Sequence, residues 1–161
     1  AGLKIRVMEN PVYIDTFKTL GTNAVPMAWT EALTALQQGT IDGQENPVNV
    51  IYSFKLNETQ KYLTMTKHSY APALFLMSKK VFGTFNKETQ DILVKAAQEA
   101  AVHERKWNAE QMAEQLKALK DKGMQITDPD TAAFQAAVKP VYEKYGPKFG
   151  TLLEDINKAK K

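Results

Sequence analysis

The fold is decided by residues 24–47, AVPMAWTEALTALQQGTIDGQENP. Within these 24 positions the sequence predicts a strand, a helix, a turn and the start of a second helix. We interpret residues 24–27 as a strand. Apolar residues at helical spacing follow, and Gly39 ends that helix. Asp42-Gly43 is a turn signal. Asn46-Pro47 pairs a favoured N-cap residue with proline at the first helical position, which predicts another helix through Phe54.

The segments on either side continue this alternation. Upstream, Leu3, Ile5 and Val7 alternate with polar neighbours and predict a strand with one buried face. A short amphipathic helix is expected from Pro11 to Gly21. Downstream, two further strands are expected, and the second is apolar enough to be buried on both faces. These downstream strands are Tyr62–Met65 and Ala71–Met77. Strands that alternate with helices in this order predict an α/β fold.

A long helix is predicted between Asn86 and Gly123, where apolar residues keep helical spacing and neither proline nor glycine intervenes. It has about 36 residues and would be roughly 54 Å long, whereas a compact globule of this size is about 40 Å across. The helix either forms a coiled coil or bridges two lobes. The apolar stripe lacks a strict heptad, which favours the bridge. A strand at Met124–Ile126 and two helices interrupted by Gly146-Pro147 should complete the chain.

Composition and charge exclude several classes of protein. The chain has 161 residues, 43% of them hydrophobic, and no cysteine, which excludes a disulfide scaffold and a thiol nucleophile. The net charge of +3 is spread evenly, with 8 basic and 6 acidic residues in 1–80 and 13 and 12 in 81–161. A nucleic-acid-binding protein is therefore not indicated. The longest apolar run has about seven residues, far fewer than the roughly 20 that span a bilayer.

Motifs for catalysis are missing from the sequence. His68 and His103 lie on different predicted elements, and neither has the spacing of a zinc-binding motif. Neither a nucleophile elbow nor a phosphate-binding glycine loop is present. Asp42 and Glu45 are close together, but they belong to a turn and a helix start. We therefore expect no enzyme, no metal site and no cofactor.

Arg6 is the first candidate for ligand binding. Only Arg6 and Arg105 among the 21 basic residues are arginine. The planar guanidinium suits a carboxylate better than the point charge of lysine does. Arg6 also lies near the carboxyl end of the first predicted strand, the edge at which open α/β sheets bind ligands. The alternative is a surface arginine that pairs with Glu9 or Glu45.

Three further residues are candidates, each with a simpler structural interpretation. Asn46 either contacts a ligand or only caps a helix. Trp29 and Tyr70 either line a pocket or belong to the hydrophobic core.

The stretch Pro26–Pro47 closely resembles the signature of the solute receptors of tripartite ATP-independent periplasmic (TRAP) transporters, of the C4-dicarboxylate-binding type. The resemblance extends upstream to the Leu3–Val7 strand and downstream through His68 and the long helix. It implies a periplasmic-binding-protein-like receptor with two α/β lobes that close on an organic acid, braced by one long helix. It also implies a periplasmic location and delivery of the solute to the membrane subunits of the transporter.

The same resemblance assigns roles to the candidate residues. Arg6 matches the arginine that clamps the carboxylate of the substrate, and Asn46 matches a hydrogen-bond partner of the ligand. Trp29 matches an aromatic residue of the pocket. Tyr70 lies where the chain begins to cross between lobes. The expected ligand is a dicarboxylate, a sugar acid or a keto acid.

The length of the chain departs from that family, whose receptors are about twice as long. The resemblance therefore implies the C-terminal half, mainly the second lobe plus the lobe-spanning helix. Residues 1–70 and 112–161 would form the second lobe, and residues 71–111 would complete the missing first lobe. An apolar surface at Ala71–Met77 is then expected to need the missing lobe or a second copy. The alternative function is a helical dimerisation module with an α/β scaffold and no ligand.

Overall fold

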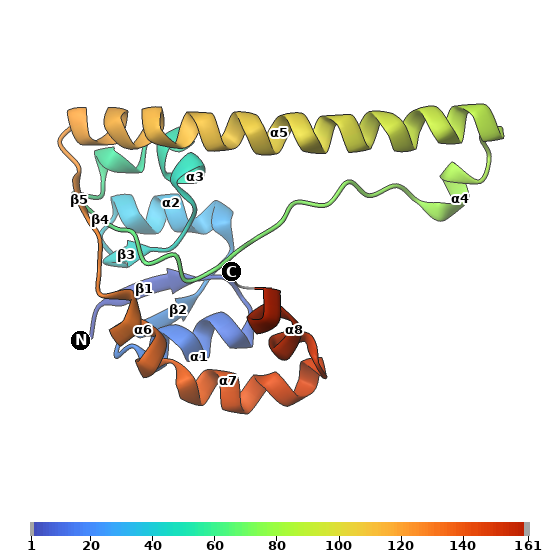
Figure 1. Cartoon of the computed structure of the whole chain (residues 1–161). Helices are drawn as coiled ribbons and strands as arrows, with labels where there is room; N and C mark the ends of the chain where they lie inside the picture. Colours follow the sequence, from blue (N-terminus) through green and yellow to red (C-terminus); the bar gives the residue numbers. More distant parts are fainter. Residues whose placement is uncertain (1, 160–161) are drawn as a thin grey trace.

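The computed structural model describes residues 2–159, in which strands and helices alternate along the chain (Figure 1). The strands are β1 (Lys4–Val7), β2 (Asn23–Pro26), β3 (Gly43–Gln44), β4 (Tyr62–Thr64) and β5 (Gln125–Thr127). The α-helices are α1 (Pro11–Thr19), α2 (Trp29–Gln37), α3 (Val48–Ser53), α4 (Lys79–Phe82), α5 (Lys87–Asp121), α6 (Thr131–Ala137), α7 (Lys139–Tyr145) and α8 (Leu152–Ala159). Two 3₁₀ helices are η1 (Leu56–Glu58) and η2 (Gly146–Phe149). The predicted α/β class is confirmed.

All strand pairs are parallel and form two separate sheets. One sheet has the order β2-β1-β3 and the other pairs β4 with β5. Arg6 of β1 lies opposite Val25 of β2 and Gln44 of β3. Parallel pairing follows from the connections, because each passes through at least one helix. Figure 1 shows α2, α3 and α5 on one side of the three-stranded sheet and α1 and α7 on the other.

The first helix begins at Pro11, as predicted. Asn10 caps α1, its side chain accepting a hydrogen bond from the amide of Val12 at 2.9 Å, and Pro11 occupies the first turn. The prediction for α3 was wrong in detail. Pro47 occupies the N-cap position and α3 begins at Val48, so Asn46 lies before the cap. The extended backbone of Pro47, with ψ of 156°, shifts the helix start by one residue and leaves the Asn46 side chain available for other contacts.

One hydrophobic core lies beneath both sheets. It is formed by residues of α2, α3, η1, β4 and the C-terminal end of α5, together with Ile41 and Met124. Leu119 of α5 is at its centre, with none of its surface exposed. Full burial of a leucine contributes roughly 1.5–3 kcal/mol. This end of α5 is therefore held in place by packing.

The long helix α5 is continuous over 35 residues, as predicted. Asn86 caps its start by accepting a hydrogen bond from the amide of Thr89 at 2.9 Å. Gly123 follows the end of α5 with a φ of 90°, a left-handed backbone conformation that is costly for any residue with a side chain. Figure 1 shows that the N-terminal part of α5 extends far beyond the sheets. We call residues 71–111 the arm and residues 2–70 and 112–159 the body.

The predicted strand at Ala71–Met77 is wrong. These residues form no strand, and the segment runs as an extended connection from the body to α4 (Figure 1). Leu74 is 74% exposed and Leu76 is 85% exposed. An apolar segment becomes a strand only beside another strand, and residues 2–159 supply none here. The expectation of an apolar surface without a partner in its own chain is confirmed.

The C-terminal part of the body follows the expected order with one difference, because three α-helices, α6, α7 and α8, follow β5 instead of the two expected. Strand β5 follows α5, and the Gly146-Pro147 interruption appears as η2 between α7 and α8. Tyr145 of α7 is buried and its hydroxyl donates to Asp15 of α1 at 2.8 Å, which fastens α7 to α1. Among residues 2–159, no helix combines the length and the apolar character that crossing a membrane requires.

Candidate functional site

Arg6 is a buried cation at the carboxyl end of β1. It is only 5% exposed, and its Nε donates a hydrogen bond to the carbonyl oxygen of Met27 at 2.8 Å. Within residues 2–159 no ion pair joins it to a carboxylate. The interpretation of Arg6 as a surface residue paired with Glu9 or Glu45 is therefore wrong. Since a buried charge is costly unless it is paired, the guanidinium is suited to an anion from outside these residues.

Trp29 supports the guanidinium of Arg6 from one side. It is the first residue of α2, directly after the turn that leaves β2, and it is partly buried. The guanidinium carbon of Arg6 lies 5.4 Å from the centre of its ring, within cation–π range. Phe54 packs edge-on against the same ring at 5.2 Å. Trp29 thus restricts the orientation of the guanidinium.

Burial and charge act on Arg6 in opposite directions. Burial lowers the pKa of Arg6, while the negative charges of Glu45 and then Glu9 raise it. Guanidinium groups remain protonated in proteins, so Arg6 is a permanent cation. The charge of Arg6 therefore does not change across the physiological pH range.

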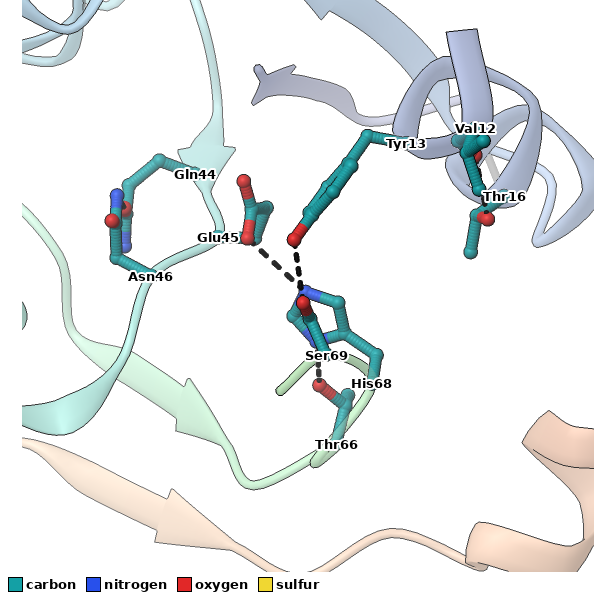
Figure 2. Close-up of polar contacts among 9 residues, drawn as sticks. All are labelled: Val12, Tyr13, Thr16, Gln44, Glu45, Asn46, Thr66, His68 and Ser69. Atoms are coloured by element: carbon teal, nitrogen blue, oxygen red, sulfur yellow. Dashed lines mark hydrogen bonds and ion pairs between the residues drawn. The ribbon is translucent and has the colours of Figure 1, made fainter. Parts of the chain in front are cut away.

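Asn46 lies in the connection that follows β3, the strand next to that of Arg6. Gln44 is the register partner of Arg6, and Asn46 follows it by two residues, before α3. The Asn46 Nδ2 donates to the Gln44 Oε1 at 2.6 Å (Figure 2). Arg6, Trp29 and Asn46 thus come from the carboxyl ends of three adjacent strands, the edge at which open α/β sheets bind ligands.

Tyr70 is not brought together with these three residues. It is 87% exposed and lies where the chain leaves the body for the arm. No contact between Tyr70 and Arg6, Trp29 or Asn46 is present in the described part of the chain. Its role in ligand binding stays a prediction.

A polar cluster next to Asn46 was missed from the sequence. The His68 Nε2 lies 3.1 Å from the Glu45 Oε2, and the His68 Nδ1 lies 2.6 Å from the Thr66 hydroxyl (Figure 2). When Nε2 carries the proton, His68 donates to Glu45 and accepts from Thr66. Lys67, between them, has a φ of 49°, which turns the chain so that His68 points back to Glu45. The cluster links the end of β3 to the segment after β4.

Helix α1 packs against the same cluster. Tyr13 forms a hydrogen bond to Ser69 at 2.5 Å, and the ring of Phe17 meets that of His68 edge-on at 5.3 Å. The cluster therefore fixes residues 66–69, the root of the arm, against the body. Glu45 and His68 are 23 residues apart, so only the strand topology brings them together. Among residues 2–159 no group of histidine and carboxylate side chains has the composition of a metal site.

Comparisons with known proteins identify the family of the chain. Residues 1–148 match the family described as bacterial extracellular solute-binding protein, family 7, DctP. A solute-binding protein from Verminephrobacter eiseniae is 46% identical over 98% of this chain and 48% of its own length. The 2,3-diketo-L-gulonate-binding periplasmic protein YiaO of Escherichia coli K12 is 39% identical over 98% of this chain and 50% of its own.

A solved structure shows the same fold. It is a TRAP periplasmic solute-binding protein from Polaromonas sp. JS666 bound to D-erythronate, with a TM-score of 0.88 and 43% identity. The match covers 94% of this chain and 50% of the other. The chain belongs to the family 7 extracellular solute-binding proteins, the receptors of TRAP transporters. It spans about half the length of the relatives it matches. Those relatives are transport proteins rather than enzymes, and they do not favour a helical dimerisation module.

Proposed function

We propose that the protein is the periplasmic receptor of a TRAP transporter and that Arg6 clamps the carboxylate of a small organic acid. The observation that carries the proposal is the burial of Arg6 without an ion-pair partner in residues 2–159. Two parallel charge-assisted hydrogen bonds from the guanidinium would be worth roughly 1.5–3 kcal/mol each. Binding of an anion would thus neutralise the one charge that the body buries alone.

The ligand class follows from the residues around the clamp and from the relatives. Gln44, the register partner of Arg6, and Asn46 carry amide groups at the end of the neighbouring strand, and amides suit hydroxyl or keto oxygens beside a carboxylate. A relative named for 2,3-diketo-L-gulonate and a solved structure with D-erythronate both handle monocarboxylic sugar acids. We infer that a sugar acid or keto acid binds better than a dicarboxylate. Asn46 and Trp29 are the accompanying contacts, and Tyr70 approaches only when a second lobe is present.

The arm provides the connection to that second lobe. All described buried residues lie in the body, and none of residues 71–111 is buried. We infer that the body is one lobe of the receptor. The relatives are about twice as long as this chain. We infer that the arm packs into the first lobe of the longer protein, which supplies the other wall of the ligand site. The closed receptor then delivers the acid to the membrane subunits.

A thermal-shift panel tests the clamp. The protein, in its full encoded length, is heated with D-erythronate, 2,3-diketo-L-gulonate, D-glucuronate and succinate. A ligand at about 100 times its Kd adds roughly 2.7 kcal/mol to the free energy of unfolding. The sugar acids should raise the Tm, and succinate should raise it less. In Arg6→Lys, loss of the planar fork should weaken affinity at least about tenfold, which corresponds to about 1.4 kcal/mol.

Arg105→Lys is the matched control, because Arg105 is the other arginine and lies on α5, away from the carboxyl ends of the strands. This variant should respond to the acids as the parent does. The melting temperature of each variant without ligand shows whether the substitution alters the fold. If Arg6→Lys binds the sugar acids as tightly as Arg105→Lys, the clamp assignment is wrong.

A further inference from the structure

A cavity of about 270 Å³ is bordered by α1, by the C-terminal helices α6, α7, η2 and α8, and by residues 66–68. Figure 1 shows α1 and α7 on the side of the three-stranded sheet opposite to α5. Arg6, Trp29 and Asn46 do not line the cavity, so it is distinct from the anion site. Its volume is close to the lower end of the range of about 300–1,000 Å³ that is typical of small-molecule sites.

Most of the cavity lining is apolar. It includes Val12 of α1, Phe134 of α6, Val141 of α7, Phe149 of η2 and Leu153 of α8. Val141 is buried, whereas Phe149 is 52% exposed, so part of the lining is open to solvent. A lining of this kind favours the hydrocarbon part of a ligand, because binding removes apolar surface from water on both sides.

The wall formed by α8 depends on a glycine. A Cβ atom on Gly146 would lie 2.7 Å from the Cδ1 of Leu153, so a side chain there would displace this leucine. The neighbouring Leu152 does not line the cavity and is 51% exposed. Helix α8 therefore directs one leucine toward the cavity and the next toward solvent.

Three polar side chains of the lining have no partner among residues 2–159. Lys67 follows β4, while Thr131 and Gln135 are four residues apart on α6 and share one face of that helix. None of the three side chains takes part in a hydrogen bond or an ion pair within the described residues. The cavity thus combines an apolar lining with an unpaired ammonium, a hydroxyl and an amide.

The charge around the cavity is positive. None of the described lining residues is an aspartate or a glutamate. Asp15 accepts a hydrogen bond from the hydroxyl of Tyr145, a lining residue, but Lys144 pairs with this carboxylate at 2.5 Å. The Lys148 ammonium lies 5.1 Å from the centre of the Tyr145 ring and has no carboxylate partner among residues 2–159. Lys67 and Lys148 therefore favour an anion.

The backbone of Lys67 gives a further indication. Its φ of 49° lies in the left-handed region, which favours glycine and asparagine over lysine. Among the described residues other than glycine, only Lys55 shares a positive φ. Since asparagine would suit this backbone better, the ammonium of Lys67 has a use that offsets the conformational cost.

We propose that this cavity binds a small monocarboxylic acid with an aromatic or branched apolar body. The apolar lining holds the body, and Lys67 neutralises the carboxylate. The hydroxyl of Thr131 and the amide of Gln135 supply further hydrogen bonds. Sugar acids do not suit this cavity, because its apolar lining leaves their hydroxyl groups without partners. The site is independent of the proposed function at Arg6.

Titration with 3-phenylpropionate, followed by amide chemical shifts, tests the proposal on the 161-residue chain and on the product of its full reading frame. The amides of Lys67, Gln135 and Gly146 report on the cavity, and that of Leu119 in the core is the reference. We expect the three cavity amides to shift together and to saturate. The neutral 3-phenylpropanamide should bind at least about tenfold more weakly, because it has no charge for Lys67. D-Glucuronate should not shift the cavity amides.

Lys67→Asn separates the ammonium from the backbone of this residue. It should weaken the binding of 3-phenylpropionate at least about tenfold and leave that of 3-phenylpropanamide unchanged. The Tm without ligand should not fall, because asparagine tolerates the left-handed backbone. Lys55→Asn is the matched control, since it makes the same change at the other left-handed lysine, outside the cavity. This variant should bind the acid as the parent does.

Leu153→Ala tests the apolar wall. It should weaken the binding of the acid and of the amide by a similar factor of at least about threefold, because both lose the same apolar contact. Leu152→Ala is the matched control on the solvent side of α8 and should leave both affinities unchanged.

Four results would overturn the proposal. The cavity amides do not shift with 3-phenylpropionate, the amide binds as tightly as the acid, or Lys67→Asn binds the acid as tightly as Lys55→Asn. The fourth is binding to the 161-residue chain that is lost in the longer protein, which would show that another part of the chain occupies the cavity.

The outcome for this cavity is separable from that for Arg6. Arg6→Lys should bind 3-phenylpropionate as the parent does. A protein that responds to sugar acids but not to 3-phenylpropionate disproves only the second site. A protein whose cavity amides shift with 3-phenylpropionate, and which responds to no sugar acid, disproves only the proposed function.

Discussion

The long helix α5 runs through both the arm and the body, but the two regions are stabilised differently. In the body, the C-terminal end of α5 buries Leu119 completely in the core. In the arm, Ile92 and Val102 of the same helix are 60% and 62% exposed. The arm helix is formed by local interactions, such as the Asn86 cap and the exposed pair of Lys95 and Glu99 at 3.9 Å. Helical structure and tertiary packing are thus separate requirements, and the arm meets only the first.

The largest expected difference between the two regions is in the loss of stability when a leucine is replaced by alanine. Leu119→Ala should lower the free energy of unfolding by about 2–5 kcal/mol, because it leaves a cavity in the core. Leu76→Ala in the arm should change it by no more than about 0.5 kcal/mol in the 161-residue chain. Urea denaturation of both variants measures the two values. Comparable losses would show that the arm is packed against the body in solution.

The arm substitution should behave differently once a second lobe is present. In the longer protein, Leu76→Ala should cost about 1.5–3 kcal/mol, because Leu76 would then be buried. The measurement is the same denaturation experiment on the full reading frame. A matched change at Met8, which is exposed in the body, should stay near zero in both proteins. A neutral Leu76→Ala in the longer protein would remove the arm from the interface between lobes.

A smaller effect is expected at the start of α5. Asn86→Ala removes the cap on the Thr89 amide and should destabilise the first turn by about 0.5–2 kcal/mol. Because the arm is not packed, the loss should remain local and leave the Tm of the 161-residue chain unchanged. Hydrogen exchange at Thr89 and Gln90 should accelerate. Asn10→Ala, the matched change in the body, should lower the Tm, since α1 is packed against the sheet.

The smallest effect concerns the ion pair that joins α1 to α7. Hydrogen bonds from Lys144 and then Tyr145 lower the pKa of Asp15, and the bond to Asp15 raises the pKa of both partners. A lowered carboxyl pKa stabilises the fold above its unfolded value, about 3.9, and this contribution disappears as the pH falls through the folded value. The raised pKa values of Lys144 and Tyr145 stabilise the fold at lower pH, and this contribution disappears as the pH rises above about 10.

The Tm of the parent should therefore exceed that of Asp15→Asn between about pH 5 and pH 9, and the two should converge toward pH 2 and pH 11. Asp91→Asn breaks an exposed pair with Lys87 in the arm and should change the stability by at most about 0.5 kcal/mol. A constant difference for Asp15→Asn across the whole range would show that the ion pair does not contribute.

The features predicted from the sequence are those with local causes. Asn86 and Gly123 delimit α5 because capping and left-handed backbone depend on single residues. The strand pattern predicts the position of Arg6 at the sheet edge, and the rarity of arginine in the chain makes it a candidate for ligand binding. Its burial and its lack of an ion-pair partner required the structure.

The predictions that failed depend on the neighbours of each segment, whether adjacent or distant. Ala71–Met77 has the apolarity of a strand, but no strand lies beside it in residues 2–159, so it stays extended and exposed. Asn46 has the chemistry of a cap, but Pro47 takes that position. The contact between Glu45 and His68 joins positions whose proximity depends on the order of strands. Sequence patterns describe what a segment favours, and the partners of that segment decide the rest.

Because α5 is one continuous helix, a small change in its angle at the body moves its far end by a much larger distance. Its arm portion, residues 87–111, reaches about 38 Å at 1.5 Å per residue, so a tilt of about 10° at the body displaces the tip by about 7 Å. The packing of Leu119 in the core therefore sets the precision with which the far end is aimed. Loosening the packing around Leu119 would therefore displace the far end of α5, even when every residue of the arm is unchanged.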